Sequence, residues 1–166
     1  MRFRLDQLFE ARLDSVQSAL VDPDFLASLA ELPNLGRPEL VSQSWSGTEL
    51  HQKVRHRFSG HLSAVVTAVV DPNRLTWVEE SVLDAETHRT RFRILPDHYP
   101  DRLSCSGTFS LSPGADRDTT ERITEGSIKV SFPLVGGRVE EAIVSGLRDH
   151  ARLEVAAVGA WLQHAN

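Results

Sequence analysis

Glutamate and histidine are the residue types of this chain best suited to acid–base chemistry. One histidine and one glutamate, His150 and Glu154, fall in a segment whose apolar pattern predicts burial. In the helix predicted over Arg138–Gln163, a rotation of about 100° per residue places Glu154 within the apolar stripe and His150 at its edge. A few polar groups of this kind orient ligands in otherwise apolar pockets. We predict that His150 and Glu154 bind a ligand; the alternative is that Glu154 meets water or an arginine at the sheet edge.

A third candidate lies in the strand predicted over Leu50–Phe58. His56 shares a face of that strand with Val54 and Phe58, whereas the opposite face is basic. This alternation predicts that His56 points into the fold. Its alternative role is that of a neutral, hydrogen-bonded core histidine.

Glu79 and Glu80 are adjacent in another predicted strand, so one carboxylate points inward and the other outward. Val78 and Val82 share a face with Glu80, and we favour Glu80 as the inward, ligand-binding residue. Leu75, Trp77 and Leu83 share the opposite face and leave Glu79 as the alternative. An inward carboxylate could act as a general base.

The remaining reactive residue types form no recognisable centre. Of the seven histidines, the close pair His51 and His56 is odd-spaced for one strand face, so we predict no metal site and no cofactor. The single cysteine, Cys105, excludes an internal disulfide and is expected to be a packing residue. Without a nucleophile or oxyanion device we predict no catalytic residue.

Composition limits the class of protein. A chain of 166 residues with 40% hydrophobic and 25% charged residues fits one globular domain over 1–166. A net charge of −5 argues against nucleic-acid binding. No window approaches the roughly 20 apolar residues of a membrane span, and the N-terminal residues lack the apolar stretch of a secretion signal, so we expect a cytoplasmic protein without stable membrane insertion. We also expect a monomer or homodimer.

Hydrophobic periodicity predicts an α+β fold. A strand at Arg2–Phe9 precedes two short helices, near Asp14–Leu20 and from Asp22-Pro23 onward, and a long helix closes the chain. Residues 61–70 fit either a strand or a short helix. Further strands are expected at Leu40–Trp45, Leu50–Phe58, Arg74–Leu83, His88–Leu95, Arg102–Leu111 and Thr119–Phe132.

The connections between these strands are short, which indicates an antiparallel meander. The apolar positions of the last strand change parity after Ile123, and we interpret Glu125-Gly126 as a bulge that bends the sheet. A helix of about 39 Å must lie across most of such a sheet. Aromatic, apolar and small residues facing this interface are predicted to form the walls of the pocket: Trp45, Trp77, Phe92, Phe109, Ile143 and Gly146.

This order of elements resembles the helix-grip fold of the START and Bet v 1-like (SRPBCC) superfamily, and most closely an actinobacterial single-domain family of unknown function within it. The resemblance covers the whole chain. It rests on the opening strand Arg2–Leu5, the paired helices in Val16–Phe25, the strand Leu75–Glu80 and the helix start at Gly136–Glu140. It implies a curved sheet of six to seven strands gripping the terminal helix.

Families of this kind bind lipids, sterols, polyketides or plant hormones between sheet and helix; some are cyclases and others act on a chaperone. We therefore expect non-catalytic binding of an apolar or amphipathic molecule, lipid-like or polyketide-like. The alternatives are an aromatase or cyclase that uses Glu80, His56 or His150 as acid and base, and a chaperone-interacting protein with a solid core. The fold alone does not select among them.

Overall fold

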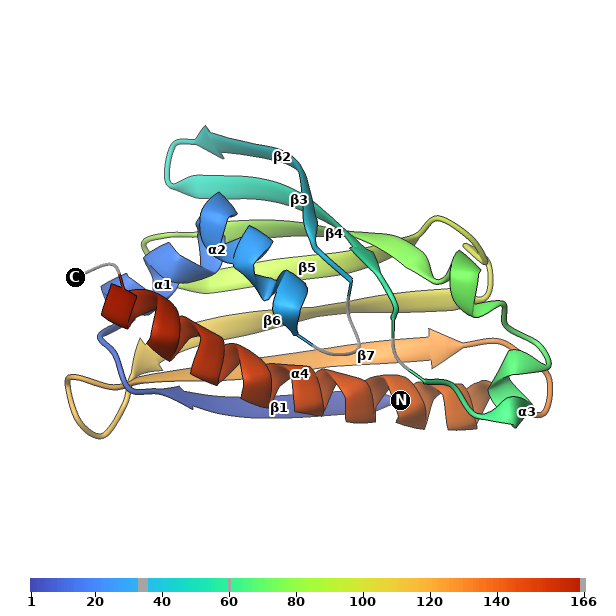
Figure 1. Cartoon of the computed structure of the whole chain (residues 1–166). Coiled ribbons are helices and arrows are strands. Elements are labelled where there is room, and N and C mark those ends of the chain that lie inside the picture. The colour runs from blue at the N-terminus through green and yellow to red at the C-terminus, as the bar shows by residue number, and fades with distance from the viewer. Residues whose placement is uncertain (33–35, 60, 165–166) are drawn as a thin grey trace.

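The computed structural model describes residues 1–32, 36–59 and 61–164, and within them an antiparallel sheet curves around a long C-terminal helix (Figure 1). The order of the strands is β1-β7-β6-β5-β4-β3-β2. Strands β2 to β7 therefore pair in the order of the sequence, and β1 pairs with β7 and forms one edge of the sheet. The strands are β1 (Arg2–Phe9), β2 (Glu39–Ser46), β3 (Glu49–Arg57), β4 (Thr76–Asp84), β5 (Arg89–Pro96), β6 (Leu103–Pro113) and β7 (Thr120–Val130).

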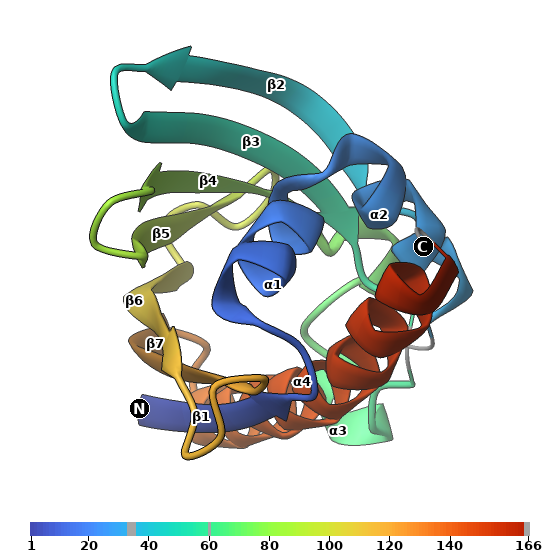
Figure 2. The ribbon, with the colours of Figure 1, turned by 90° about the vertical axis from the view of Figure 1, so that its left-hand side faces the viewer.

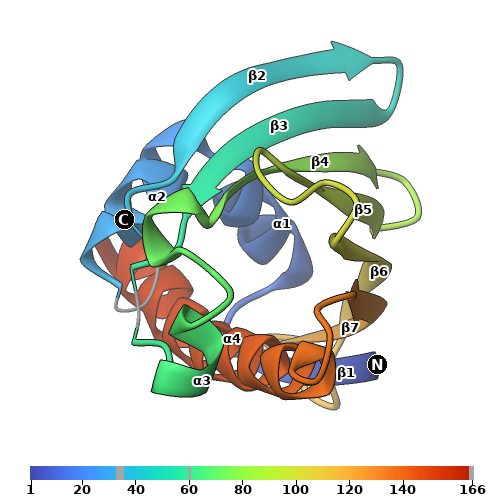
Figure 3. The same ribbon diagram turned by 90° about the vertical axis from the view of Figure 1, so that its right-hand side faces the viewer.

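The helices lie on the concave side of this sheet. Figures 2 and 3, which view the molecule from opposite sides, show the strands as an open arc, with α4 beside β1 and with α1 and α2 within the opening. The helical segments are α1 (Leu13–Val21), α2 (Pro23–Ser28), η1 (Leu29–Glu31), α3 (Ala64–Thr67), η2 (Pro72–Arg74) and α4 (Gly136–His164). The predicted α+β helix-grip architecture is confirmed.

Local chemistry explains the boundary between the two short helices. The Asp22 carboxylate accepts hydrogen bonds from the backbone N–H groups of Asp24, at 2.8 Å, and Phe25. Pro23 occupies the first turn of α2, where its missing N–H is not needed. This pair of residues starts α2 directly after α1 ends and turns the chain beneath the sheet.

Two uncertain segments of the sequence are resolved. Residues 64–67 within the ambiguous stretch form the short helix α3, and Val66 and Val70 are buried there. The predicted bulge at Glu125-Gly126 was wrong, because β7 pairs in unbroken register with β1 and β6. Gly126 instead lies opposite Gly107, and a Cβ at Gly126 would stand 2.5 Å from the Cζ atom of Phe3.

Two separate clusters of buried hydrophobic residues pack against α4. One lies near the N-terminal half of α4 and includes Phe3, Ile128 and Val144; the other lies near its C-terminal half and includes Phe9 and Val158. Between these two clusters, residues of α4 in the range 147–154 line a cavity. No helix among the described residues meets the length and hydropathy of a membrane span.

Candidate ligand-binding cavity

A cavity of about 220 Å³, partly open to solvent, lies between the concave face of the sheet, α1, α2 and the middle of α4. Its walls are mainly apolar, because alternate residues of each strand face the same side of the sheet. Large side chains from several elements contribute to these walls: Leu50, Val54, Leu83, Phe92, Phe109 and Leu147.

A buried ion pair joins α4 to the sheet at one side of the cavity. The Arg122 guanidinium of β7 pairs with the Glu154 carboxylate of α4, and its Nε donates a hydrogen bond of 2.6 Å to Gln7 Oε1 of β1. Gln7 Nε2 donates to Glu154 and, at 2.7 Å, to the carbonyl oxygen of Ala151. Three elements are thereby tied together by one polar network.

The groups around this network favour the ionised forms of Arg122 and Glu154. The Arg122 guanidinium lies 5.6 Å from the ring centroid of Phe9 and 5.2 Å from that of Phe109, within cation–π range. Burial opposes ionisation of Glu154, but the charges of Arg122 and His150 and hydrogen bonds from Gln7 and Arg122 outweigh it. Together they hold the pKa of Glu154 below its ordinary value. The predicted alternative of an arginine partner for Glu154 is thus realised inside the fold.

The inward carboxylate of β4 is Glu79. Its carboxylate lines the cavity and makes no hydrogen bond or ion pair with any described side chain. Burial, with a smaller contribution from the negative charge of Glu154, raises the pKa of Glu79 to about 7 against the opposing charge of Arg122. Glu79 is therefore a group that changes protonation near neutral pH.

The prediction that Glu80 faces inward was wrong. Glu80 lies on the outer face of β4 between Lys53 and Arg93, its directly paired neighbours, and forms ion pairs of 2.6 and 2.5 Å with them. Hydrogen bonds from these two cations lower the pKa of the Glu80 carboxyl. Valines flank Glu80 on the outer face because β-branched residues favour strands on either face.

Three buried nitrogen atoms in the cavity wall have no hydrogen-bond partner: Gln52 Nε2, His56 Nδ1 and His150 Nδ1. His56 stacks on Trp77 with ring centroids 5.7 Å apart. Burial lowers the pKa of His56 to about 4, helped by the nearby charge of His150, so His56 is neutral at neutral pH. Buried polar atoms without partners are rare in proteins, and each one needs an explanation.

Half of the predicted site residues line this cavity: His56, Phe92, Phe109, His150 and Glu154. The other half do not. Trp45 is 58% exposed at the β2–β3 hairpin, and Trp77 stacks against His56 without lining the cavity itself. Ile143 packs against the N-terminal cluster of α4, and a Cβ at Gly146 would meet nothing within 4 Å.

Gln7 and Arg122, the partners of Glu154 in this network, were not predicted from the sequence. Their signal was present in β7, where Arg122 and Thr124 occupy inward positions and Ile123 faces outward. That reversed pattern was interpreted as a bulge. A strand that places polar residues on the buried face is equally typical of a binding site.

Cys105 lines the same cavity and provides a built-in reporter. Burial, with a smaller effect of Glu79, raises the pKa of the Cys105 thiol from 9.0 to about 11, which lowers its thiolate fraction about a hundredfold. We expect iodoacetamide to label the folded protein about a hundredfold more slowly than the urea-unfolded chain at the same pH. Mass spectrometry of the single cysteine measures both rates, and equal rates would contradict its placement in the cavity wall.

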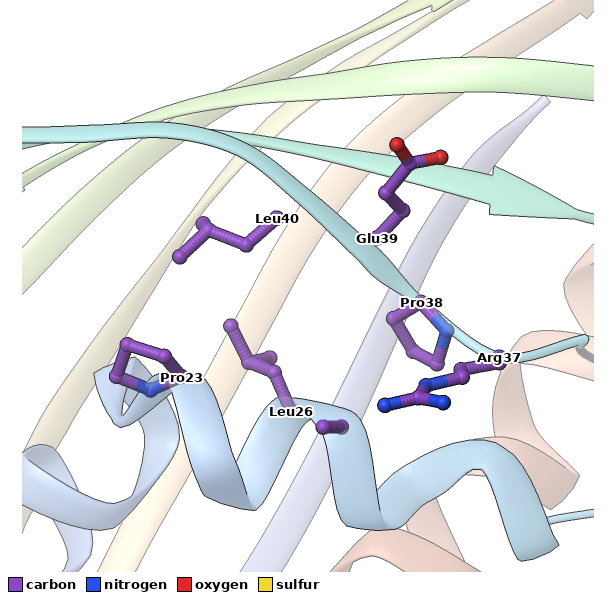
Figure 4. A pocket seen from close by; sticks show the side chains of 7 residues that line it. Pro23, Leu26, Arg37, Pro38, Glu39 and Leu40 are labelled. Atoms are coloured by element: carbon purple, nitrogen blue, oxygen red, sulfur yellow. The ribbon is translucent and has the colours of Figure 1, made fainter.

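A surface groove adjoins the cavity at Leu26. The groove lies between α2 and the start of β2, and its residues include Pro23, Pro38 and Leu40, with Arg37 and Glu39 beside them (Figure 4). Leu26 lines both the groove and the cavity.

A family model described as "Protein of unknown function (DUF2505)" matches residues 5–162. The chain belongs to this family. No curated protein matches its sequence. Within the described residues of this DUF2505 member, no group of three or more histidine, cysteine, aspartate or glutamate side chains could hold a metal ion.

Solved structures share the fold of the DUF2505 chain at low sequence identity. A protein from Thermus thermophilus matches with a TM-score of 0.69 and 16% identity over 100% of this chain and 99% of its own. The Zhui aromatase/cyclase from a Streptomyces species matches at 0.64 and 15%, over 100% and 96%. A START superfamily protein from Mycobacterium smegmatis matches at 0.58 and 12%, over 99% of each chain. These similarities confirm the predicted START-like fold.

Proposed function

We propose that this protein binds an apolar or amphipathic small molecule in the cavity between the sheet and α4, without transforming it. The observation that carries the proposal is the set of three buried nitrogen atoms without a hydrogen-bond partner, on Gln52, His56 and His150, in the wall of a largely apolar cavity that Glu79 also lines. Ligand sites combine these two features, whereas solid cores avoid them.

Energetics support this interpretation. Each buried polar atom without a partner costs about 1–3 kcal/mol, so several of them are a substantial cost for a domain of this size. A bound molecule or water that reaches these atoms recovers part of that cost, and an apolar body beside Leu83 and Phe92 adds hydrophobic stabilisation.

Filling the cavity should abolish binding. Ser81 and Val82 are adjacent on β4, and Ser81 lines the cavity whereas Val82 lies on the opposite face. We expect Ser81→Phe to eliminate ligand retained through gentle purification and Val82→Phe to leave it in place. Native mass spectrometry, followed by extraction and profiling of small molecules, measures both.

The controls for this experiment are folding and occupancy. Circular dichroism and thermal unfolding establish that both variants keep the fold. If wild-type protein purified from its native host carries no small molecule and binds no apolar probe, the proposal fails. Equal occupancy in Ser81→Phe and Val82→Phe would contradict this location of the site.

An enzyme of the aromatase or cyclase class is the second candidate. It is favoured by Glu79, which changes protonation near neutral pH, and by neutral His56 in the same cavity, since acid–base catalysis needs such a pair. Incubating the protein with its ligand and identifying the compound that is recovered distinguishes the two functions. Recovery of the bound compound unchanged supports binding, and conversion that Glu79→Gln stops supports the enzyme.

A further inference from the structure

Two of the polar side chains in the cavity wall, Gln52 and Glu79, come from neighbouring positions of the paired strands β3 and β4. On β4, Glu79 is paired directly with Val54 of β3, so Gln52 and His56 are its diagonal neighbours on the same face. Diagonal neighbours in a sheet have Cβ atoms less than about 8 Å apart. Two hydrogen bonds that meet at one oxygen span about 5 Å, so flexible Gln52 and Glu79 side chains can reach a common atom.

The chemistry of these groups selects the kind of atom. The Gln52 amide nitrogen is a donor only, and it needs an acceptor. The Glu79 carboxylate is an acceptor and needs a donor, and it takes a proton near neutral pH. A hydroxyl group both accepts and donates, so it satisfies the two side chains together.

The charges of the cavity disfavour an anion. Apart from the histidines, Arg122 is the only cationic side chain among the described residues that line it, and Arg122 already pairs with Glu154. A ligand carboxylate beside Glu79 would add a second negative group with no free counterion, which is costly in a buried site.

We infer that the ligand presents an uncharged hydroxyl group to Gln52 and Glu79 and does not present a carboxylate. This inference rests on the proposed function and names the ligand class: a hydroxylated apolar molecule, such as a phenolic ring system. His56 and His150, with their free Nδ1 atoms, are placed to contact further oxygens of the same molecule.

Three probes of one shape test the inference: naphthol, naphthoate and naphthalene, compared by isothermal titration at about pH 8. At that pH an ordinary histidine is neutral and a phenol is still protonated. We expect naphthol to bind at least about tenfold more tightly than either other probe, as one hydrogen bond to a charged group provides.

Adjacent variants on β3 locate the effect. Gln52→Leu removes the inward donor, and Lys53→Leu removes an outward charge of the same strand. We expect Gln52→Leu to lower the preference for naphthol over naphthalene at least about threefold while naphthalene affinity is retained, because the hydrogen bond to Glu79 remains, and Lys53→Leu to behave as wild type. The comparison of three probes on wild-type protein stands even if one variant fails to fold.

The outcomes separate the two proposals. Naphthoate binding as tightly as naphthol, or an equal preference for naphthol in Gln52→Leu, overturns the hydroxyl inference and leaves the binding function in place. If none of the three probes binds and no retained molecule is found, the proposed function itself fails.

Discussion

Arg122→Met is expected to destabilise the folded protein by about 3–5 kcal/mol, because it leaves a buried charge without its partner. Glu154 is only 13% exposed, and its side chain keeps a single weaker hydrogen bond, from Gln7. Gln7 Oε1 loses its donor as well. Urea unfolding followed by circular dichroism measures the change in the free energy of unfolding.

An arginine on the outer face of the same two strands is the matched control. Arg4 of β1 forms ion pairs with Asp6 and with Glu125 of β7, all of them exposed to solvent. Exposed pairs contribute roughly 0–1 kcal/mol, so Arg4→Met should have little effect. If Arg122→Met costs no more than Arg4→Met, the buried network does not tie α4 to the sheet.

A double variant separates the ion pair from the shape of the site. In Arg122→Met combined with Glu154→Leu no unpaired charge remains, and replacing a buried pair by apolar groups is often neutral. We expect the double variant to recover most of the stability lost in Arg122→Met. Additive losses would mean that the two side chains act independently.

The elements of the fold were predictable because burial on one face leaves a periodic trace. The alternation of Phe3 and Leu5 indicated β1. The four-residue spacing of Val139, Ile143, Leu147 and Ala151 indicated α4. The stretch 61–70 stayed ambiguous because a four-residue helix is shorter than two helical periods.

Only half of the residues predicted for the pocket line the cavity, because polar residues in its wall break that same trace. His56, His150 and Glu154 were predicted to face inward because each lies on or beside an otherwise apolar face, and all three line the cavity. In β7 the interruption was longer, with Arg122 and Thr124 both inward, and it imitated a change of register. Only the pairing of β7 with both its neighbours shows which face is buried.

The choice between Glu79 and Glu80 illustrates a second limit. Period-two geometry fixes that they face opposite sides, but apolar residues flank both. What decides the orientation is the outer row formed by Lys53, Glu80 and Arg93 across three strands, and the sequence does not show that these residues are neighbours. Cross-strand register is tertiary information.

The two titrating groups of the cavity predict opposite dependences of stability on pH. Glu79 has a folded-state pKa raised from 4.5 to about 7, so it favours the fold below pH 4.5 and loses this contribution as pH rises to about 7. His56 has a folded-state pKa lowered from 6.5 to about 4, so its contribution is complete above pH 6.5 and is lost as pH falls to about 4. Each shift corresponds to about 3 kcal/mol.

Between about pH 4.5 and 6.5 these two dependences cancel in the wild-type protein, so single variants are needed to reveal them. Relative to wild type, Glu79→Gln should gain about 3 kcal/mol of stability as pH rises from 4.5 to 7, and His56→Gln should gain about as much as pH falls from 6.5 to 4. Urea unfolding at a series of pH values measures both differences.

Glu80→Gln is the control, because its stability relative to wild type should change with pH in the opposite direction to that of Glu79→Gln. The pKa of Glu80 is lowered by its hydrogen bonds to Lys53 and Arg93, so its contribution is present above pH 4.5 and is lost in acid. Relative to wild type, Glu80→Gln should therefore lose stability as pH rises, whereas Glu79→Gln gains it. Opposite pH slopes for these two adjacent glutamates would demonstrate that β4 separates a largely apolar cavity from a charged, solvated face. Slopes of the same sign would show that Glu79 titrates as a surface carboxylate.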